Sequence, residues 1–97
     1  MDINDCIEMV VEASGQKVED ICSRKRRRPL PVCRYLIAEY FHNQGRSFSG
    51  AGMEMRIDHA TVVHGIKMLS QIRDGYGLPE ETQIVNRWDE LINNKNK

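Results

Sequence analysis

Side chains that can form hydrogen bonds to a ligand are concentrated in the tract 57–66, IDHATVVHGI. Asp58 suits the N-cap of a helix, because its carboxylate can accept a hydrogen bond from a backbone N–H one turn further on. A helix is therefore expected to begin there and to run to about Arg73. The small and polar residues in its first two turns are His59, Ala60, Thr61 and His64. Donors, acceptors and a methyl group gathered in this way are suited to contacting the edges of nucleic-acid bases.

Aliphatic residues fall on the opposite side of this expected helix. Val62, Ile66 and Leu69 recur at helical spacing and should face the core. The polar residues lie off that face, where a helix-turn-helix protein presents side chains to base edges in the major groove of DNA. The alternative is an ordinary amphipathic helix with a solvated polar face and a capping aspartate, and the tract by itself is compatible with both.

A basic segment, residues 24–28 followed by Arg34, is the second distinctive feature. Its cations are Arg24, Lys25, Arg26, Arg27, Arg28 and Arg34, and no acidic residue interrupts them. Six acidic residues precede it, namely Asp2, Asp5, Glu8, Glu12, Glu19 and Asp20. The whole chain has 14 basic and 14 acidic residues, so only this polarised distribution favours a polyanionic ligand. A solvated charged loop is the alternative interpretation.

Helical periodicity runs through the chain, and no stretch shows the alternation of period two that is typical of strands. We expect one all-α domain over residues 1–97, a compact bundle of about six helices that contains a helix-turn-helix. The expected helices run from Ile3 to about Gly15, around Val18–Cys22, from Pro31 to about Gly45, over Ser49–Met55, from Asp58 to about Arg73, and from Pro79 or Glu80 to about Asn93. Pro31 should open the third helix, where its missing N–H costs nothing. Ser49 should cap the fourth, and Ala51 and Gly52 should pack it closely against its neighbour.

Patterns for catalysis or metal binding are not found in the sequence. His59 and His64 are five residues apart and lack the glutamate of a zinc-binding H-E-x-x-H helix. Gly50 and Gly52 lack the lysine and the spacing of a phosphate-binding P-loop. The three cysteines form no zinc-ligand pair and are expected to be buried thiols: Cys6, Cys22 and Cys33. We therefore expect no enzymatic activity, no cofactor and no metal ion.

The cellular compartment can also be predicted from the sequence. An odd number of cysteines without a signal peptide indicates a reducing environment. No apolar run is long enough to span a bilayer. A cytoplasmic protein without a membrane partner is expected.

With these features in order, the chain resembles the C-terminal DNA-binding domain of DnaA, the bacterial chromosomal replication initiator. The resemblance covers about residues 3–73. Its most specific part is the tract 58–67, DHATVVHGIK, which is similar to the D-H-[TSA]-T-V-x-H tract of that family. The second part is the basic segment leading into a long helix. The resemblance implies the helix-turn-helix fold of that domain, which is similar to that of the Trp repressor, with residues 79–93 as an additional C-terminal helix.

The family resemblance implies roles for individual residues. Asp58 and His59 would contact base edges in the major groove, and Arg26 would enter the adjacent minor groove. The methyl group of Ala60 can touch a thymine methyl, and an inserted arginine favours a narrow, A·T-rich minor groove. Contacts to the DNA backbone are expected from Thr61, His64, Arg34, Lys25, Arg27, Arg28, Ser49, Arg56 and Lys67.

The chain also departs from the family pattern. Ala60 stands where many members have a hydroxyl, Ile57 where a basic residue is usual, and Arg56 where glycine is usual. Gly50 and Ala51 replace a larger acidic and aliphatic pair. The ATPase domain of the initiator is not part of the sequence, so a stand-alone relative is expected.

These features together predict sequence-specific binding to double-stranded DNA, at an A·T-rich site similar to a DnaA box. A role in replication initiation or its regulation is implied, with the protein associated with the nucleoid. A regulator of transcription or of a mobile element is an alternative, and so is a protein-interaction module that keeps the fold and has lost DNA binding. The prediction requires Arg26 and His59 to lie on the same side of the molecule, with His59 not hidden inside.

Overall fold

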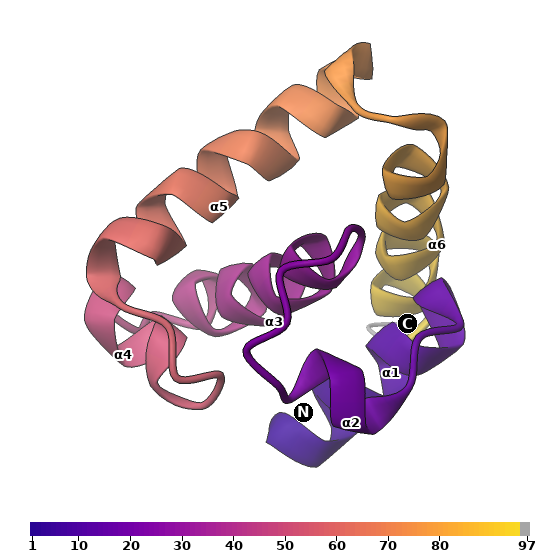
Figure 1. Ribbon diagram of the computed structural model, residues 1–97. Helices are drawn as coiled ribbons and strands as arrows, with labels where there is room; N and C mark the ends of the chain where they lie inside the picture. The colour runs from indigo at the N-terminus through magenta and orange to yellow at the C-terminus, as the bar shows by residue number, and fades with distance from the viewer. Residues whose placement is uncertain (96–97) are drawn as a thin grey trace.

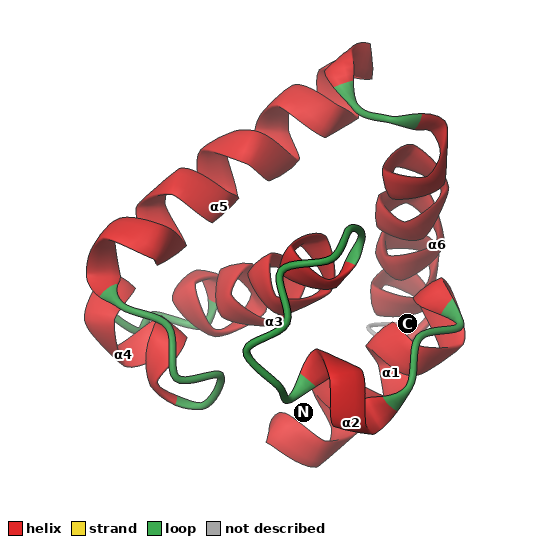
Figure 2. Cartoon of the chain, viewed as in Figure 1, coloured by secondary structure: helices red, strands yellow, loops and turns green. Residues whose placement is uncertain are grey.

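The computed structural model describes residues 1–95 (Figure 1). Every regular element in this range is helical, and Figure 2 shows loops but no strands between the helices. The elements are α1 (Ile3–Ser14), α2 (Val18–Ile21), α3 (Leu30–Asn43), α4 (Phe48–Met53), α5 (His59–Gln71), the π-helical turn η1 (Ile72–Tyr76) and α6 (Pro79–Lys95). The expected all-α bundle of about six helices is confirmed over the described residues.

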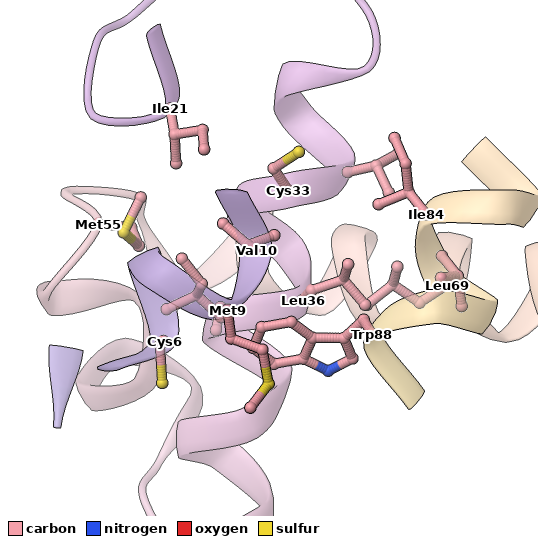
Figure 3. Packing of buried hydrophobic residues seen from close by; sticks show 14 of the residues in the cluster. Cys6, Met9, Val10, Ile21, Cys33, Leu36, Met55, Leu69, Ile84 and Trp88 are labelled. Atoms are coloured by element: carbon pink, nitrogen blue, oxygen red, sulfur yellow. The ribbon is translucent and has the colours of Figure 1, made fainter. Parts of the chain in front are cut away.

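Helix α3 is the centre of the bundle. It contacts α1, α2, α4, α5 and α6, and its buried residues therefore occupy more than one face. Side chains from α1, α3, α5 and α6 meet around Leu36, with Met9, Leu69 and Trp88 among them (Figure 3). Burying a large apolar side chain contributes about 1.5–3 kcal/mol, so this cluster fixes how the helices are arranged.

Helix α6 covers the core. Its Ile84, Val85 and Trp88 are at most 3% exposed and belong to the central cluster. Arg73 in η1 adds a polar clamp beside it. The guanidinium donates two hydrogen bonds to Glu39 of α3, at 2.7 and 2.8 Å, and two to Asp89 of α6, at 3.0 and 2.9 Å. The C-terminal helix is thus an integral part of the domain.

Several helix ends lie where the sequence predicts them. The N-cap Asp2 and Asp5 form a reciprocal capping box at the start of α1. Gly15 ends that helix with a positive φ of 71°, and its N–H donates to the carbonyl oxygen of Val11. Helix α5 runs to Gln71, close to the predicted end at about Arg73, and continues as η1, where Gly75 has a φ of 99°. Helix α6 extends two residues beyond the predicted Asn93.

Two helix starts differ from the prediction. Helix α3 begins at Leu30, and Pro31 is its second residue, which is also a position without an intrahelical donor. Helix α4 begins at Phe48 and is capped by Ser47, whose hydroxyl accepts a hydrogen bond from the N–H of Gly50. The prediction of Ser49 as the cap was wrong, because the extended backbone that an N-cap requires is found at Ser47.

The prediction of three buried thiols was correct for two. Cys6 and Cys33 are fully buried in the core, and burial raises the pKa of the Cys6 thiol to about 11. Cys22 is exposed. Because α2 ends at Ile21, the helical periodicity that would bury Cys22 stops one residue before it.

None of the helices within residues 1–95 is both long and apolar enough to cross a membrane.

Candidate nucleic-acid interface

The start of α5 is built as the sequence predicts. Asp58 has an extended backbone, with φ of −82° and ψ of 171°, and its Oδ1 accepts a hydrogen bond of 2.8 Å from the N–H of Thr61. Hydrogen bonds from the side chain and the backbone of Thr61 hold the pKa of Asp58 below its ordinary value. The carboxylate is therefore ionised at neutral pH. It caps α5 through Oδ1 and is exposed as a hydrogen-bond acceptor.

Close packing of α5 against two neighbours decides which of its faces remains open. Gly65 lies against Tyr35 of α3, so that an added Cβ would come within 2.5 Å of the tyrosine ring. Val62 and Leu69 are buried, and Ile66 is half-buried. The other face carries the exposed residues His59, Ala60, His64 and Lys67, with Thr61 half-buried. The predicted assignment of the two faces is confirmed.

A groove of about 800 Å³ separates this face of α5 from the basic segment. Arg24 and Arg26, in the loop between α2 and α3, line one part of it. That loop is the thin purple tube that runs from α2 to α3 in Figure 1. The α5 side contributes Arg56, Asp58, Ala60, Thr61 and His64. Arg26 and the start of α5 therefore line the same groove.

His59 lies outside this groove, next to α4. Its ring meets that of Phe48 edge to face, with centroids 5.5 Å apart. Phe48 in turn stacks on His42 of α3 at 4.2 Å, and Nδ1 of His42 lies 2.8 Å from the carbonyl oxygen of Arg46. The sequence analysis missed Phe48 and His42. No local signal identifies them, because ten residues of chain lie between Phe48 and His59 and only the α4–α5 turn brings the rings together.

The cations of the basic segment have different partners. Asp20 lies 2.8 Å from Nζ of Lys25 and 3.4 Å from a guanidinium nitrogen of Arg27. Arg28 lies 3.4 Å from the buried carboxylate of Glu81. Arg24 and Arg26 have no ion pair with any residue in 1–95. Of the five consecutive cations 24–28, the two that line the groove, Arg24 and Arg26, are thus the two without an ion pair in residues 1–95.

Arg34 is a buried part of the groove lining and is held by backbone carbonyl groups. It is 7% exposed at the floor of the groove. Its Nε donates to the carbonyl oxygen of Ile21 at 2.8 Å, and a terminal nitrogen donates to that of Asp20 at 3.0 Å. Burial lowers the pKa of its guanidinium. In this structure Arg34 ties α3 to the end of α2, and its contribution to contacts with the DNA backbone stays a prediction.

The remaining predicted contacts are on the surface. Ser49, Arg56 and Lys67 are all exposed. Arg56 has a positive φ of 56°, a conformation that glycine adopts more readily. The turn before α5 therefore uses a backbone conformation that glycine adopts at lower cost than arginine. Tyr35 also lines the groove and meets His64 edge to face at 6.2 Å.

Comparison with known proteins adds no assignment, since no protein-family model, no curated protein and no solved structure matches the chain. Within residues 1–95 no group of three or more histidine, cysteine, aspartate or glutamate side chains is placed to hold a metal ion.

Replacing Asp58 with alanine should lower the thermal unfolding midpoint at neutral pH, because the N–H of Thr61 loses its acceptor. The folded-state pKa of Asp58 is below its unfolded value, so its contribution is complete above the unfolded pKa and is lost as pH falls through the folded one. The gap between wild type and Asp58→Ala should therefore narrow below about pH 4. Circular dichroism melts across this range measure it, with Asp74→Ala as the control. A gap that is independent of pH would contradict the charge-assisted cap.

Proposed function

We propose that the chain is a sequence-specific module for double-stranded DNA. Helix α5 enters the major groove, and the basic segment lies along the adjacent minor groove. The observation that carries this proposal is the common groove between Arg24 and Arg26 on one side and Asp58, Ala60 and Thr61 on the other. Helices α4 and α5, packed together through a short turn, form the helix-turn-helix pair that such binding uses.

The chemistry of the exposed residues fits this orientation. The free carboxylate oxygen of Asp58 can accept from a cytosine amino group, and Ala60 offers a methyl group to thymine. His59 is exposed beside Phe48, on the α4 side of these residues, and its ring can donate or accept a hydrogen bond. Arg26 has no carboxylate partner and can enter a narrow A·T-rich minor groove, where the negative potential is enhanced. A short, asymmetric, A·T-rich site follows from these contacts.

The family assignment is part of the proposal. The tract 58–67 and the basic segment support a relative of the DnaA C-terminal domain, and its role would be in replication initiation or the regulation of replication at the nucleoid. A regulator of transcription or of a mobile element would use the same surface. Selection of sites from random duplex DNA with the purified protein distinguishes these, because the recovered motif identifies both a DnaA box and its genomic neighbourhood.

Arg26→Ala and His59→Ala should each weaken binding to the selected duplex about tenfold or more, because each removes a contact to base edges or to a narrow groove. Binding to a scrambled duplex should change less. Fluorescence anisotropy at fixed salt measures both affinities. Arg87→Ala is the matched control, since this arginine lies on α6 and pairs with Glu12 and Glu90.

Equal losses on both duplexes would reduce the proposal to a nonspecific DNA binder. If wild type shows no salt-dependent binding to any duplex but forms a stable complex with a protein, the interaction-module alternative is favoured.

A further inference from the structure

Two carboxylates from outside the basic segment hold three of its five consecutive cations. Asp20, at the end of α2, pairs with Lys25 and Arg27 through different oxygens. Glu81, in the first turn of α6, pairs with Arg28. Residues 24–27 form no regular secondary structure, and Lys25 and Arg27 both reach Asp20. Arg24 and Arg26 are thereby left to line the groove.

Asp20 is held firmly enough to act as a fixed partner. Its side chain is 17% exposed. Its own carbonyl oxygen accepts hydrogen bonds from the hydroxyl of Ser23 at 2.7 Å and from the guanidinium of Arg34 at 3.0 Å. The hydrogen bond from Lys25 is the main cause of the lowered pKa of this carboxyl group, which is ionised at neutral pH. The carboxylate of Asp20 therefore neutralises Lys25 and Arg27, as a DNA phosphate would do if Asp20 were absent.

Glu81 is a more buried partner. Its side chain is 3% exposed, and its Oε2 has no hydrogen bond, so the Arg28 guanidinium 3.4 Å away is the compensating charge. Removing either member of a buried pair leaves a charge that is costly to bury alone. Arg28 is consequently restrained against α6 although its own side chain is 56% exposed.

We propose that Asp20 and Glu81 are specificity-determining residues, which withhold Lys25, Arg27 and Arg28 from the phosphates of arbitrary DNA and leave Arg24 and Arg26 to bind at the groove. This inference rests on the proposed function and goes beyond it. Phosphate contacts contribute affinity without sequence information, so cations that are paired internally lower nonspecific binding more than specific binding. The net charge of zero over the whole chain also lowers its attraction to arbitrary DNA.

Asp20→Asn is the decisive variant, because it keeps the backbone carbonyl and the shape of the side chain while removing the charge. We expect affinity for a scrambled duplex to rise roughly tenfold, and affinity for the selected duplex to rise less. The slope of log K against log salt should become steeper by about 1.8, since two further cations then release counterions at about 0.9 each. Anisotropy titrations at several salt concentrations measure both quantities.

Glu19→Gln is the matched control. Glu19 is the exposed neighbour of Asp20 on the same short helix, and its substitution changes the net charge by the same amount. If Glu19→Gln steepens the slope as much as Asp20→Asn does, the effect is one of net charge and the inference is overturned. In a Lys25→Gln/Arg27→Gln background, Asp20→Asn should leave the slope unchanged, and a change of slope there would also overturn it.

Retention on immobilised heparin separates this inference from the proposed function. Heparin is a sulfated polyanion that carries no base sequence. Its retention of the protein therefore depends on how many lysine and arginine side chains are free to replace its counterions. Asp20→Asn should elute at higher salt than Glu19→Gln. If it does while wild type shows no preference among duplexes, the proposed function fails and the internal pairing stands. If the two variants elute together, the internal pairing fails whatever the outcome on DNA. Circular dichroism confirms that each variant is folded.

Discussion

A methyl group added at Gly52 is expected to destabilise the chain by about 3 kcal/mol, at the upper end of the usual cost of overpacking. The Cβ of Gly52→Ala would overlap the carbonyl oxygen of Ile57 and come within 2.7 Å of Val62 Cγ2. Backbone cannot move aside as a flexible side chain can. The carbonyl of Gly52 also accepts the N–H groups of Met55 and Ile57, so the whole turn into α5 is built on this residue. Binding to the selected duplex should fall with stability, because α5 loses its fixed orientation.

Gly50→Ala in the same helix is the control for this prediction. An added Cβ there meets the hydroxyl of Ser47 at 3.2 Å, a contact that a small adjustment relieves. Alanine is favoured over glycine within a helix by about 1 kcal/mol, so this variant should be neutral or slightly stabilising. Urea denaturation gives both free energies of unfolding. Similar midpoints for Gly52→Ala and Gly50→Ala would show that α4 and α5 are not in close contact.

The fold was largely predictable because its determinants are local. Asp2, Gly15 and Asp58 set helix ends by capping within four residues, and apolar spacing identified the long helices. Close packing through Ala51 and Gly52 was also predicted, and both are buried. Which serine caps α4 could not be predicted from nearby residues, because both Ser47 and Ser49 have a hydroxyl that can cap a helix. The path of the chain from α3 places Ser47 at the N-cap.

The candidate site was predictable in its composition and less so in its contacts. Arg26 and Asp58 share a groove, whereas His59 is exposed outside it. Arg34 was predicted to contact phosphate, yet its hydrogen-bond acceptors lie 13 and 14 residues away on α2, in a loop geometry that no periodicity encodes. The same applies to Glu81 and Arg28, which are brought together only when α6 packs on the bundle. Charge counting in sequence therefore overstates how many cations are free.

Arg34→Met is expected to cost about 3 kcal/mol and to release the basic segment while leaving the rest of the bundle folded. Methionine fills similar space but donates nothing to the carbonyl oxygens of Ile21 and Asp20, and each buried polar group left without a partner costs about 1–3 kcal/mol. Amide hydrogen exchange should accelerate in the basic segment more than in α3. Arg34→Lys should recover only part of the stability, since one ammonium group does not reproduce the planar guanidinium that reaches both carbonyls.

Comparing Arg24→Met with Arg34→Met shows whether Arg34 acts on stability or on phosphate binding. Arg24 is exposed on the groove and has no carboxylate beside it in residues 1–95, so its loss should flatten the salt slope by about 0.9 without changing the free energy of unfolding. If Arg34 were a phosphate ligand instead, Arg34→Met would behave like Arg24→Met, and Arg34→Lys would keep nearly full affinity. Because burial has already removed the Arg34 guanidinium from solvent, we expect its substitution to act first on stability and only through the displaced segment on DNA binding.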